Sequence, residues 1–399
     1  MEGNENRQVQ NGQPIQEGKA RKTLLILRRV LAVVLTVLLV VTAVAVVVYR
    51  DRLNLDSIKR YLNYQALERN DQGLGVEFAI SADKSSSFLS MDDCLIACSS
   101  NRIQVYSNGG SLYVDTSAAI LNPVMSKEGG YALVYDAGGS ELYLFSDRQL
   151  IHEYKAASDS AIISARVNKN GWLAIAEEAA GYKASVTVYN DKFQPVLTEN
   201  ISSSFVMDAV VSPDNRQLAV VTLGQDETKF TSTLRIFEFS EGAEQVTQEI
   251  SDSPTLDLRW SDNGFWLQEQ NSLRRMSSSG QLEGAWQDAS LHLRGFSLDG
   301  DGFAVEYMSR YRSGNVGALF VINEAGEVSA ELNLTEEVLS VTAAGRYIGV
   351  LTHSEMTIYT SDLNEYAVLE HDGNIVNAMV RSDGTAMLVT ENTASVFLP

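Results

Sequence analysis

A tight polar turn followed by an aromatic or aliphatic residue recurs along the chain, and this repeat constrains the fold more than any other feature. The turns are SKEGG before Tyr131, NKNG before Trp172, SPDNRQ before Leu218, SDNG before Phe265, LDGDG before Phe303, AAGR before Tyr347 and RSDG before Thr385. Their spacing scatters around roughly forty-odd positions, which is typical of a four-stranded propeller blade.

Between the turns, short runs rich in Val, Ile, Tyr, Phe and Thr alternate with clusters of Gly, Asn, Asp and Ser, and no segment keeps a helical period. Residues 73–399 are therefore predicted to form an all-β domain. Shared among eight blades, this range gives about 41 residues per blade, and shared among seven it gives about 47, so eight fits the usual blade length better. We predict an eight-bladed β-propeller, with seven blades as the alternative.

The two ends of the repeat predict how the ring closes. The last unit, IVNAMVRSDGTAMLVTENTASVFLP, has only three strands before Pro399, whereas GVEFAIS at residues 75–81 is a strand ahead of the first unit. We predict that this N-terminal strand completes the last blade. Such pairing removes an open edge that would otherwise invite aggregation.

A twenty-residue uncharged run, VLAVVLTVLLVVTAVAVVVY from Val30 to Tyr49, precedes the propeller. As a helix it would extend about 30 Å, the thickness of the hydrocarbon core of a bilayer. We predict one transmembrane helix over residues 24–49. The alternative is a signal peptide cleaved after Ala45, because Ala43-Val44-Ala45 has the small-x-small form of a cleavage site.

Basic residues are concentrated before this run, which predicts its direction. Five lysines and arginines lie between Lys19 and Arg29, whereas Arg50, Asp51 and Arg52 follow with one net positive charge. The positive-inside rule leaves the N-terminus in the cytoplasm. The predicted order is a disordered cytoplasmic tail (1–23), the transmembrane helix (24–49), a juxtamembrane helix or linker (50–72) and an extracellular propeller (73–399).

The charge of the exported part excludes one class of function. Residues 1–50 hold seven basic and three acidic residues, so the remainder has 24 basic and 48 acidic residues. An acidic surface repels nucleic acid, and we expect no nucleic-acid partner.

The two cysteines, Cys94 and Cys98, lie four apart in one predicted strand, about 13 Å from each other, so they are expected to be buried thiols rather than a disulfide.

The chain lacks recognisable catalytic and metal motifs. It has no Gly-x-Ser-x-Gly nucleophile elbow, and it lacks the tryptophan docking motifs and adjacent cysteine pair of quinoprotein dehydrogenases. Asp299 and Asp301 in LDGDG suggest a calcium loop, but position twelve from Asp299 is Arg310, so a hairpin turn is favoured. We expect no enzyme activity, no cofactor and no metal site.

Polar residues on the predicted inner strands are the candidate ligand-binding set. They are Arg166, Asp208, Asp257, Arg259, Arg294 and Asn377. One interpretation is a solvated channel lining with mutual salt bridges, and the other is a polar ligand site at the channel mouth.

Two segments resemble known propellers. VSPDNRQLAVV (211–221) resembles the Ser-Pro-Asp-Gly turn and following strand of WD40 and TolB-like propellers, and HDGNIVNAMVRSDGTAMLVT (371–390) resembles an inner half-blade, although the blade-closing Trp-Asp dipeptide is missing. With its anchor, the whole chain resembles uncharacterised single-pass membrane proteins of Gram-positive, clostridia-type bacteria that carry a domain of unknown function. The resemblance implies a fold and a location but no activity.

The expected function is a protein-interaction or assembly platform at the cell surface. Loops from every blade converge on two broad faces of a stiff ring, so several residues can contact one partner. The expected partners are the membrane, through a single span, and another surface or membrane protein, with the oligomeric state left open. The alternative is a sensor or enzyme that binds a glycan or peptide at the channel mouth.

Overall fold

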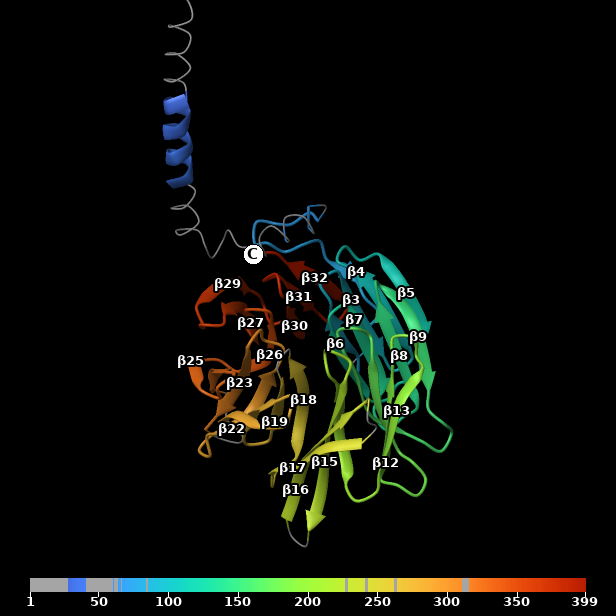
Figure 1. The fold of residues 1–399 in the computed structure, drawn as a ribbon. Helices are drawn as coiled ribbons and strands as arrows, with labels where there is room; N and C mark the ends of the chain where they lie inside the picture. The colour runs from blue at the N-terminus through green and yellow to red at the C-terminus, as the bar shows by residue number, and fades with distance from the viewer. Residues whose placement is uncertain are drawn as a thin grey trace, which may run out of the picture. The chain divides into compact units, whose positions relative to one another are not determined.

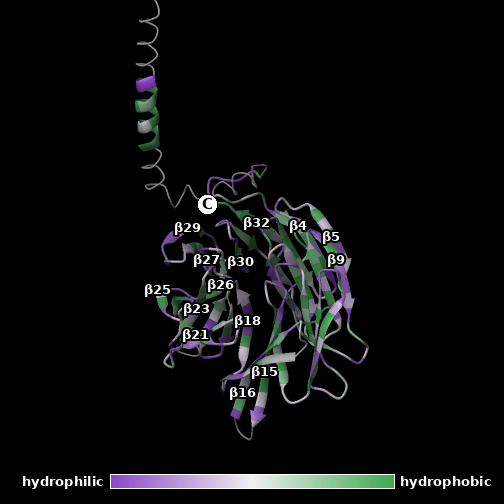
Figure 2. Ribbon diagram, viewed as in Figure 1, coloured by the Kyte–Doolittle hydropathy of each residue, from purple (hydrophilic) through white to green (hydrophobic). Residues whose placement is uncertain are grey.

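The structure is a computed structural model that describes residues 28–40, 60, 64–65, 67–83, 85–226, 229–240, 243–261, 264–310 and 316–399. The chain separates into two units, residues 1–61 and 62–399. In the first unit residues 28–40 are helical, and their large apolar side chains are exposed. Figure 2 shows this helix as largely hydrophobic beyond a hydrophilic first turn.

Only part of the predicted transmembrane segment is therefore described. Within the ranges given above, no helix is both long enough and apolar enough to cross a membrane. The predicted tail (1–23), residues 24–27 and 41–49 of the predicted span, and residues 50–59, 61–63 and 66 of the predicted linker lie outside the described residues. Membrane anchoring and its direction stay predictions.

The second unit contains eight four-stranded antiparallel sheets, numbered here as blades in chain order. Blade 1 contains β2 (Ser87–Ser90), β3 (Cys94–Ser99), β4 (Arg102–Ser107) and β5 (Leu112–Ser117), and blade 2 contains β6 (Pro123–Glu128), β7 (Tyr131–Asp136), β8 (Glu141–Ser146) and β9 (Gln149–Lys155). Blade 3 contains β10 (Ile162–Val167), β11 (Leu173–Glu177), β12 (Ala184–Tyr189) and β13 (Pro195–Ile201), and blade 4 contains β14 (Phe205–Val211), β15 (Gln217–Asp226), β16 (Lys229–Glu238) and β17 (Ala243–Ser251). Blade 5 contains β18 (Thr255–Ser261), β19 (Gly264–Glu269), β20 (Leu273–Ser277) and β21 (Leu282–Trp286), and blade 6 contains β22 (His292–Ser297), β23 (Phe303–Ser309), β24 (Ala318–Asn323) and β25 (Val328–Asn333). Blade 7 contains β26 (Val338–Ala344), β27 (Tyr347–Thr352), β28 (Glu355–Thr360) and β29 (Glu365–Glu370), and blade 8 contains β30 (Asn377–Val380), β31 (Ala386–Val389), β32 (Thr393–Phe397) and β1 (Phe78–Ala79).

This arrangement confirms the predicted eight-bladed β-propeller. In seven blades the hydrogen-bonded order of the strands is their order along the chain, whereas blade 8 has the order β1-β32-β31-β30. Figure 1 shows the C-terminal strands β31 and β32 beside β3 and β4 of blade 1. Residues of both groups share one core cluster, which includes Leu95, Tyr106 and Met387.

The seven predicted turns each connect the first strand of a blade to its second. Two of their glycines lie against an aromatic ring of the preceding blade. Gly171 has φ of 80°, and a Cβ built on it would lie 2.7 Å from the Tyr131 ring; Gly384 has the same φ and a corresponding distance of 2.8 Å to Tyr347. Glycine allows both the left-handed backbone and the close approach of the ring. This contact explains why an aromatic residue often follows the turn.

The N-terminal strand closes the ring as the sequence predicts. Phe78 pairs with Ala394 and Ala79 with Thr393 in an antiparallel ladder. Backbone hydrogen bonds extend this pairing at both ends, from Gly75 N to Val396 O at 2.8 Å and from Ile80 N to Asn392 O at 2.9 Å. The two ends of the chain's β region therefore form one blade.

The hydrophobic core lies between neighbouring blades. One cluster joins Ile96 and Val105 of blade 1 to Val134 and Phe145 of blade 2. Cys94 and Cys98 belong to this cluster as buried free thiols, and burial raises the pKa of each to about 12. A thiol with such a pKa is not a nucleophile at neutral pH, in agreement with the expectation of buried thiols.

A carboxyl group is buried between blades 5 and 6. Glu306 on β23 is 1% exposed, and its Oε1 accepts a hydrogen bond of 2.6 Å from Gln268 Nε2 on β19. Burial raises the pKa of Glu306 to about 7 from an ordinary value of 4.5, and the Gln268 hydrogen bond opposes this effect. Below about pH 7 the protonated carboxyl is therefore favoured in the folded protein.

We expect deletion of residues 73–81 to make the protein aggregate or unfold at a much lower temperature. The deletion removes one ladder of blade 8 and exposes the edge of β32. Removal of residues 1–49 serves as the control and should leave the melting temperature of the propeller unchanged. Equal melting temperatures with and without residues 73–81 would refute closure by β1.

The buried Glu306 gives a pH-dependent stability that a Glu306→Gln variant should lack. The unfolded chain releases the Glu306 proton near pH 4.5 but the folded protein only near pH 7. The wild type should therefore lose stability relative to the variant as the pH rises from 5 to 8, by at most roughly 3 kcal/mol. Denaturant unfolding of both proteins at the two pH values measures this difference. A difference that does not vary with pH would contradict the burial of an ionisable Glu306.

Candidate functional site

The ring has two distinct faces because every inner strand runs in the same direction. Four antiparallel strands return the chain to the side on which a blade began, so all inner strands start on one side. The turns after the inner strands meet on the other side, where Gly300 and Gly345 of successive blades form a parallel bridge. We call the side that carries these turns the turn face and the opposite side the entry face.

Arg166 joins three neighbouring blades near the turn face. From β10 its guanidinium donates to Asp208 on β14, with Nε to Oδ2 at 2.9 Å and Nη2 to Oδ2 at 2.6 Å. The same Nη2 donates to Asp257 Oδ1 on β18. Three of the six predicted residues, from blades 3, 4 and 5, are thus brought together in one ion-pair cluster.

Arg259 forms a second cluster that crosses the ring. Its Nη2 lies 2.7 Å from Glu128 Oε2 at the end of β6, and its Nη1 lies 2.7 Å from Asp299 Oδ1 in the turn after β22. Glu128 belongs to blade 2 and Arg259 to blade 5, which are not neighbours in the ring. The ion pair therefore bridges the channel.

Partial burial adds a desolvation free energy to the charged groups of these clusters. The side chains of Arg166 and Arg259 are 23% and 22% exposed. Burial raises the pKa of Asp257; Arg166 opposes the rise, and the nearby charges of Asp208 and Asp299 add to it. Burial alone would lower the pKa values of Arg166 and Arg259. The neighbouring carboxylates together have the larger, opposite effect and raise both pKa values, so both arginines stay charged.

Two cavities open beside these clusters. The first has a volume of about 440 Å³ and is lined from blades 2 to 6, by residues that include Ser126, Asn168 and Trp260. The second has a volume of about 420 Å³ and extends toward Asp92 of blade 1 and Ser382 of blade 8. Four residues line both cavities, and they are Lys127, Glu128, Arg259 and Asp299. We call these four residues the junction.

Lys127 is an internal cation at the junction. Its Nζ donates to the backbone oxygen of Ser90 on β2 at 2.6 Å. Burial lowers the pKa of Lys127, and the charges of Asp299 and Asp92 oppose this effect. The site thus already holds one ammonium group between a carbonyl oxygen and carboxylates.

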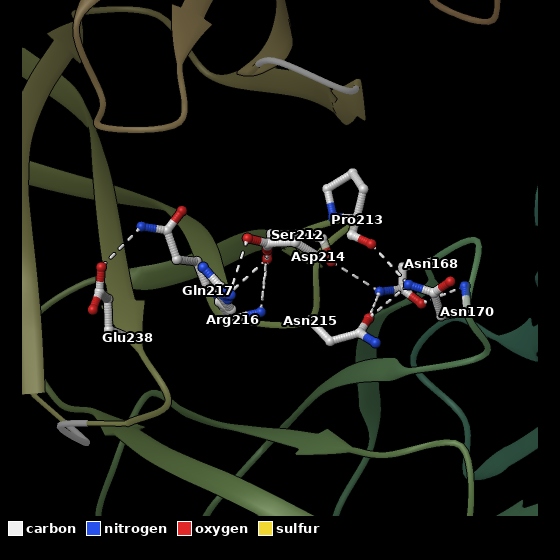
Figure 3. A network of polar contacts seen from close by, with 9 residues as sticks. All are labelled: Asn168, Asn170, Ser212, Pro213, Asp214, Asn215, Arg216, Gln217 and Glu238. Carbon is white, nitrogen blue, oxygen red and sulfur yellow. Dashed lines mark hydrogen bonds and ion pairs between the residues drawn. The ribbon is translucent and has the colours of Figure 1, made fainter.

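An asparagine network fixes the wall of the first cavity (Figure 3). Asn168 Nδ2 donates to Ser212 O at 2.9 Å and to Asn215 Oδ1 at 2.6 Å. Asn170 Nδ2 from the same turn donates to Pro213 O at 2.7 Å. These bonds join the turns of blades 3 and 4, and they explain the polar residues of NKNG and SPDNRQ. The wall is preorganised because its donors and acceptors satisfy each other.

Arg381 joins the N-terminal segment around Tyr64 to the ring through hydrogen bonds. Arg381, in the turn after β30, is fully buried, and it donates to Ser90 Oγ at 2.7 Å, Tyr64 Oη at 3.1 Å and Asn108 Oδ1 at 2.9 Å. Arg69 Nη1 also donates to Leu398 O at 3.1 Å. The chain therefore enters the propeller on its turn face, at the seam between blades 8 and 1.

The remaining two predicted residues lie elsewhere. Arg294 is an exposed residue of β22, and Asn377 begins β30 at the entry face. Of the six predicted residues only Arg166 and Arg259 line the two cavities, and Asp208, Asp257, Arg294 and Asn377 do not. Within the described ranges, no group of three or more His, Cys, Asp or Glu side chains is arranged to hold a metal ion.

Sequence reasoning missed Glu128, Lys127 and Arg381 and interpreted Asp299 only as a turn residue. All four lie at the end of an inner strand or in the turn that follows. A systematic comparison of charged residues at this position of the repeat would have found them. No feature of the sequence indicates which of them pair across the ring.

Exposed apolar side chains lie on the entry face, and others lie at the turn-face ends of outer strands, among them Leu112, Val196, Leu282 and Val328. Five of those on the entry face lie within two residues of the start of an inner strand. They are Leu121, 80% exposed, Phe205, 57%, Leu256, 51%, Leu339, 41%, and Val376, 54%. Inner strands in these five blades therefore place apolar groups around the entry to the channel.

One family model matches the chain, over residues 58–256. Its description is "Family of unknown function (DUF5711)". The match covers the N-terminal segment and blades 1 to 4. No curated protein is significantly similar in sequence. The family and the fold together agree with a propeller domain of unknown function.

Solved propellers show the same fold at low sequence identity. The computationally designed Ika8 protein matches with a TM-score of 0.58 and 13% identity, over 81% of this chain and 99% of that one. The C-terminal WD40 domain of Sif2 matches with a TM-score of 0.56 and 12% identity, over 77% and 93%. The propeller of Cps50 (Swd1) from Myceliophteria thermophila has a TM-score of 0.50 and 12% identity, over 71% and 98%. At this identity the likeness concerns the fold alone.

Replacement of Arg259 by alanine should destabilise the protein by about 1–3 kcal/mol, because Glu128 and Asp299 would lose their shared counter-ion. Arg102→Ala is the matched control, since the Arg102–Asp115 pair is about two-fifths exposed and should contribute less than about 1 kcal/mol. Denaturant unfolding gives both values. Equal losses would contradict a structural role for the cross-channel pair.

Proposed function

We propose that this protein is a membrane-anchored, non-catalytic propeller that binds another protein outside the cell membrane through its entry face. The observation that carries the proposal is the set of apolar side chains around that face, among them Leu121, Phe205 and Leu256. Exposed apolar patches are typical of protein-interaction sites. The pairs Phe205 with Leu256 and Leu339 with Val376 come from neighbouring blades. The partner would be a surface or membrane protein.

The rigidity of the ring supports this role. Cores between neighbouring blades and the closed blade 8 hold the starts of the inner strands in fixed positions. A preorganised surface loses little conformational entropy on binding, so more of the contact energy appears as affinity. Phe205 is a suitable anchor because aromatic side chains are frequent among the residues that dominate binding energy.

The membrane part of the proposal rests on the uncharged run from Val30 to Tyr49 and the basic residues before it. In this proposal the N-terminus is cytoplasmic and the propeller extracellular. An anchor would confine the propeller to the membrane surface and so raise its effective concentration near other membrane proteins.

Crosslinking in the native membrane, followed by mass spectrometry, tests the proposal. The wild type should capture one protein in stoichiometric yield, and a Phe205→Asp/Leu256→Asp double variant should lose at least about tenfold of that yield because two charges would be buried in the interface. Leu112→Asp, at a similarly exposed position on the outer strand β5, is the matched control and should capture normally.

Arg294→Ala should also leave capture unchanged. Capture by the double variant at the wild-type level, with normal melting temperatures of all variants, would refute the entry face as the interface.

A further inference from the structure

We propose that the turn-face cavities bind a basic side chain, a lysine ammonium or an arginine guanidinium, of an extended peptide segment. This site lies on the face opposite to the apolar residues of the proposed protein interface. The inference is therefore independent of the proposed function, and the two can fail separately.

The first argument is the charge of the site. The two ion-pair clusters contain two guanidinium groups, those of Arg166 and Arg259, and four carboxylates. The carboxylates are Asp208, Asp257, Glu128 and Asp299. Counted over every charged residue that lines the two cavities, there are seven carboxylates and five cations; the carboxylates are Asp92, Asp93, Glu128, Asp147, Asp299, Asp301 and Glu324, and the cations are Lys127, Arg148, Arg166, Lys169 and Arg259. The net charge of these groups is negative by two, and a bound cation would reduce the repulsion among them.

The second argument is the unused hydrogen-bonding capacity of a carboxylate at the junction. Asp299 Oδ1 pairs with Arg259, and among the described residues Asp299 Oδ2 accepts no hydrogen bond. The Asp299 side chain lines both cavities and is 36% exposed, so an incoming donor can reach it. Asp257 also has an Oδ2 atom that accepts no hydrogen bond from the described residues, but it lines neither cavity. A group with several N–H donors, as in lysine or arginine, suits the Asp299 oxygen.

Lys127 provides an internal precedent for this chemistry. Its ammonium lies at the junction on the Ser90 carbonyl, with the charges of Asp299 and Asp92 nearby. The site therefore accommodates a desolvated primary ammonium group already. A second cation placed beside Asp299 would have Glu128 of blade 2 and Asp299 of blade 6 as counter-ions.

The shape of the site favours a peptide over a compact cation. The cavities of about 440 and 420 Å³ meet at the junction, so together they exceed the volume of a single side chain. The wall formed by Asn168 and its partners, with Ser126 and Ser261 nearby, offers polar groups to a peptide backbone. A basic side chain inserted at the junction would thus belong to a segment that lies across both cavities.

Calorimetric titration of the full-length protein in a non-ionic detergent tests the inference. The probes are Nα-acetyl-lysine methylamide, Nα-acetyl-arginine methylamide and, as the uncharged control, the norleucine analogue. We expect saturable binding of at least one basic probe and none of norleucine. Asp299→Asn should weaken that binding by tenfold or more, because it removes one charge-assisted hydrogen bond.

Asp191→Asn, with the same loss of charge at an exposed outer turn of blade 3, should bind as the wild type does. Glu128→Gln repeats the test at the second carboxylate of the junction, and melting temperatures show that both site variants fold. Failure of the wild type to bind either basic probe, or equal affinity of the wild type and both folded site variants, would overturn the inference. Binding of spermidine without either amino-acid probe would also overturn it, in favour of a free polyamine ligand.

Discussion

The pairing of β1 with β32 is the constraint on which the rest of the propeller depends. Blade 8 has only three strands without it, and its outer edge would expose unpaired backbone groups. The pairing also brings the segment around Tyr64 and Arg69 to the turn face, where Arg381 and the Leu398 carbonyl hold it. Closure therefore depends on side-chain contacts beyond the short β1 ladder.

Closure in turn places charges from distant blades in one site. Glu128 and Arg259 are far apart in the sequence and belong to blades that do not adjoin, yet they form an ion pair because the ring brings their inner strands to a common channel. Arg166, Asp208 and Asp257 meet through three successive blades. These ion pairs stabilise charged groups that have lost part of their hydration, and they hold the channel walls at fixed separations.

The two faces of the ring have different chemistry for a structural reason. Inner strands end in tight polar turns, where Asn and Asp satisfy backbone groups and charged residues gather at the channel. Inner strands begin after the segments that connect one blade to the next, and Leu121, Phe205 and Val376 are exposed there. The turns after the inner strands are thus polar and line the two cavities, whereas apolar side chains are exposed at the starts of several inner strands.

The amino-acid sequence by itself determined the features that depend on local pattern: the repeat of turns, the number of blades and the strand that closes the ring. A turn such as NKNG and the strands beside it are specified by neighbouring residues, so Gly171 could be placed as the equivalent of Gly130, and Trp172 as the equivalent of Tyr131, in successive blades. Only the tertiary structure decided that Arg259 pairs with Glu128 and Asp299 and that Arg294 and Asn377 lie outside the cavities. The periodic pattern places a residue on an inner strand but carries no information about which charge faces it across the channel, because that depends on how all the blades close into one ring.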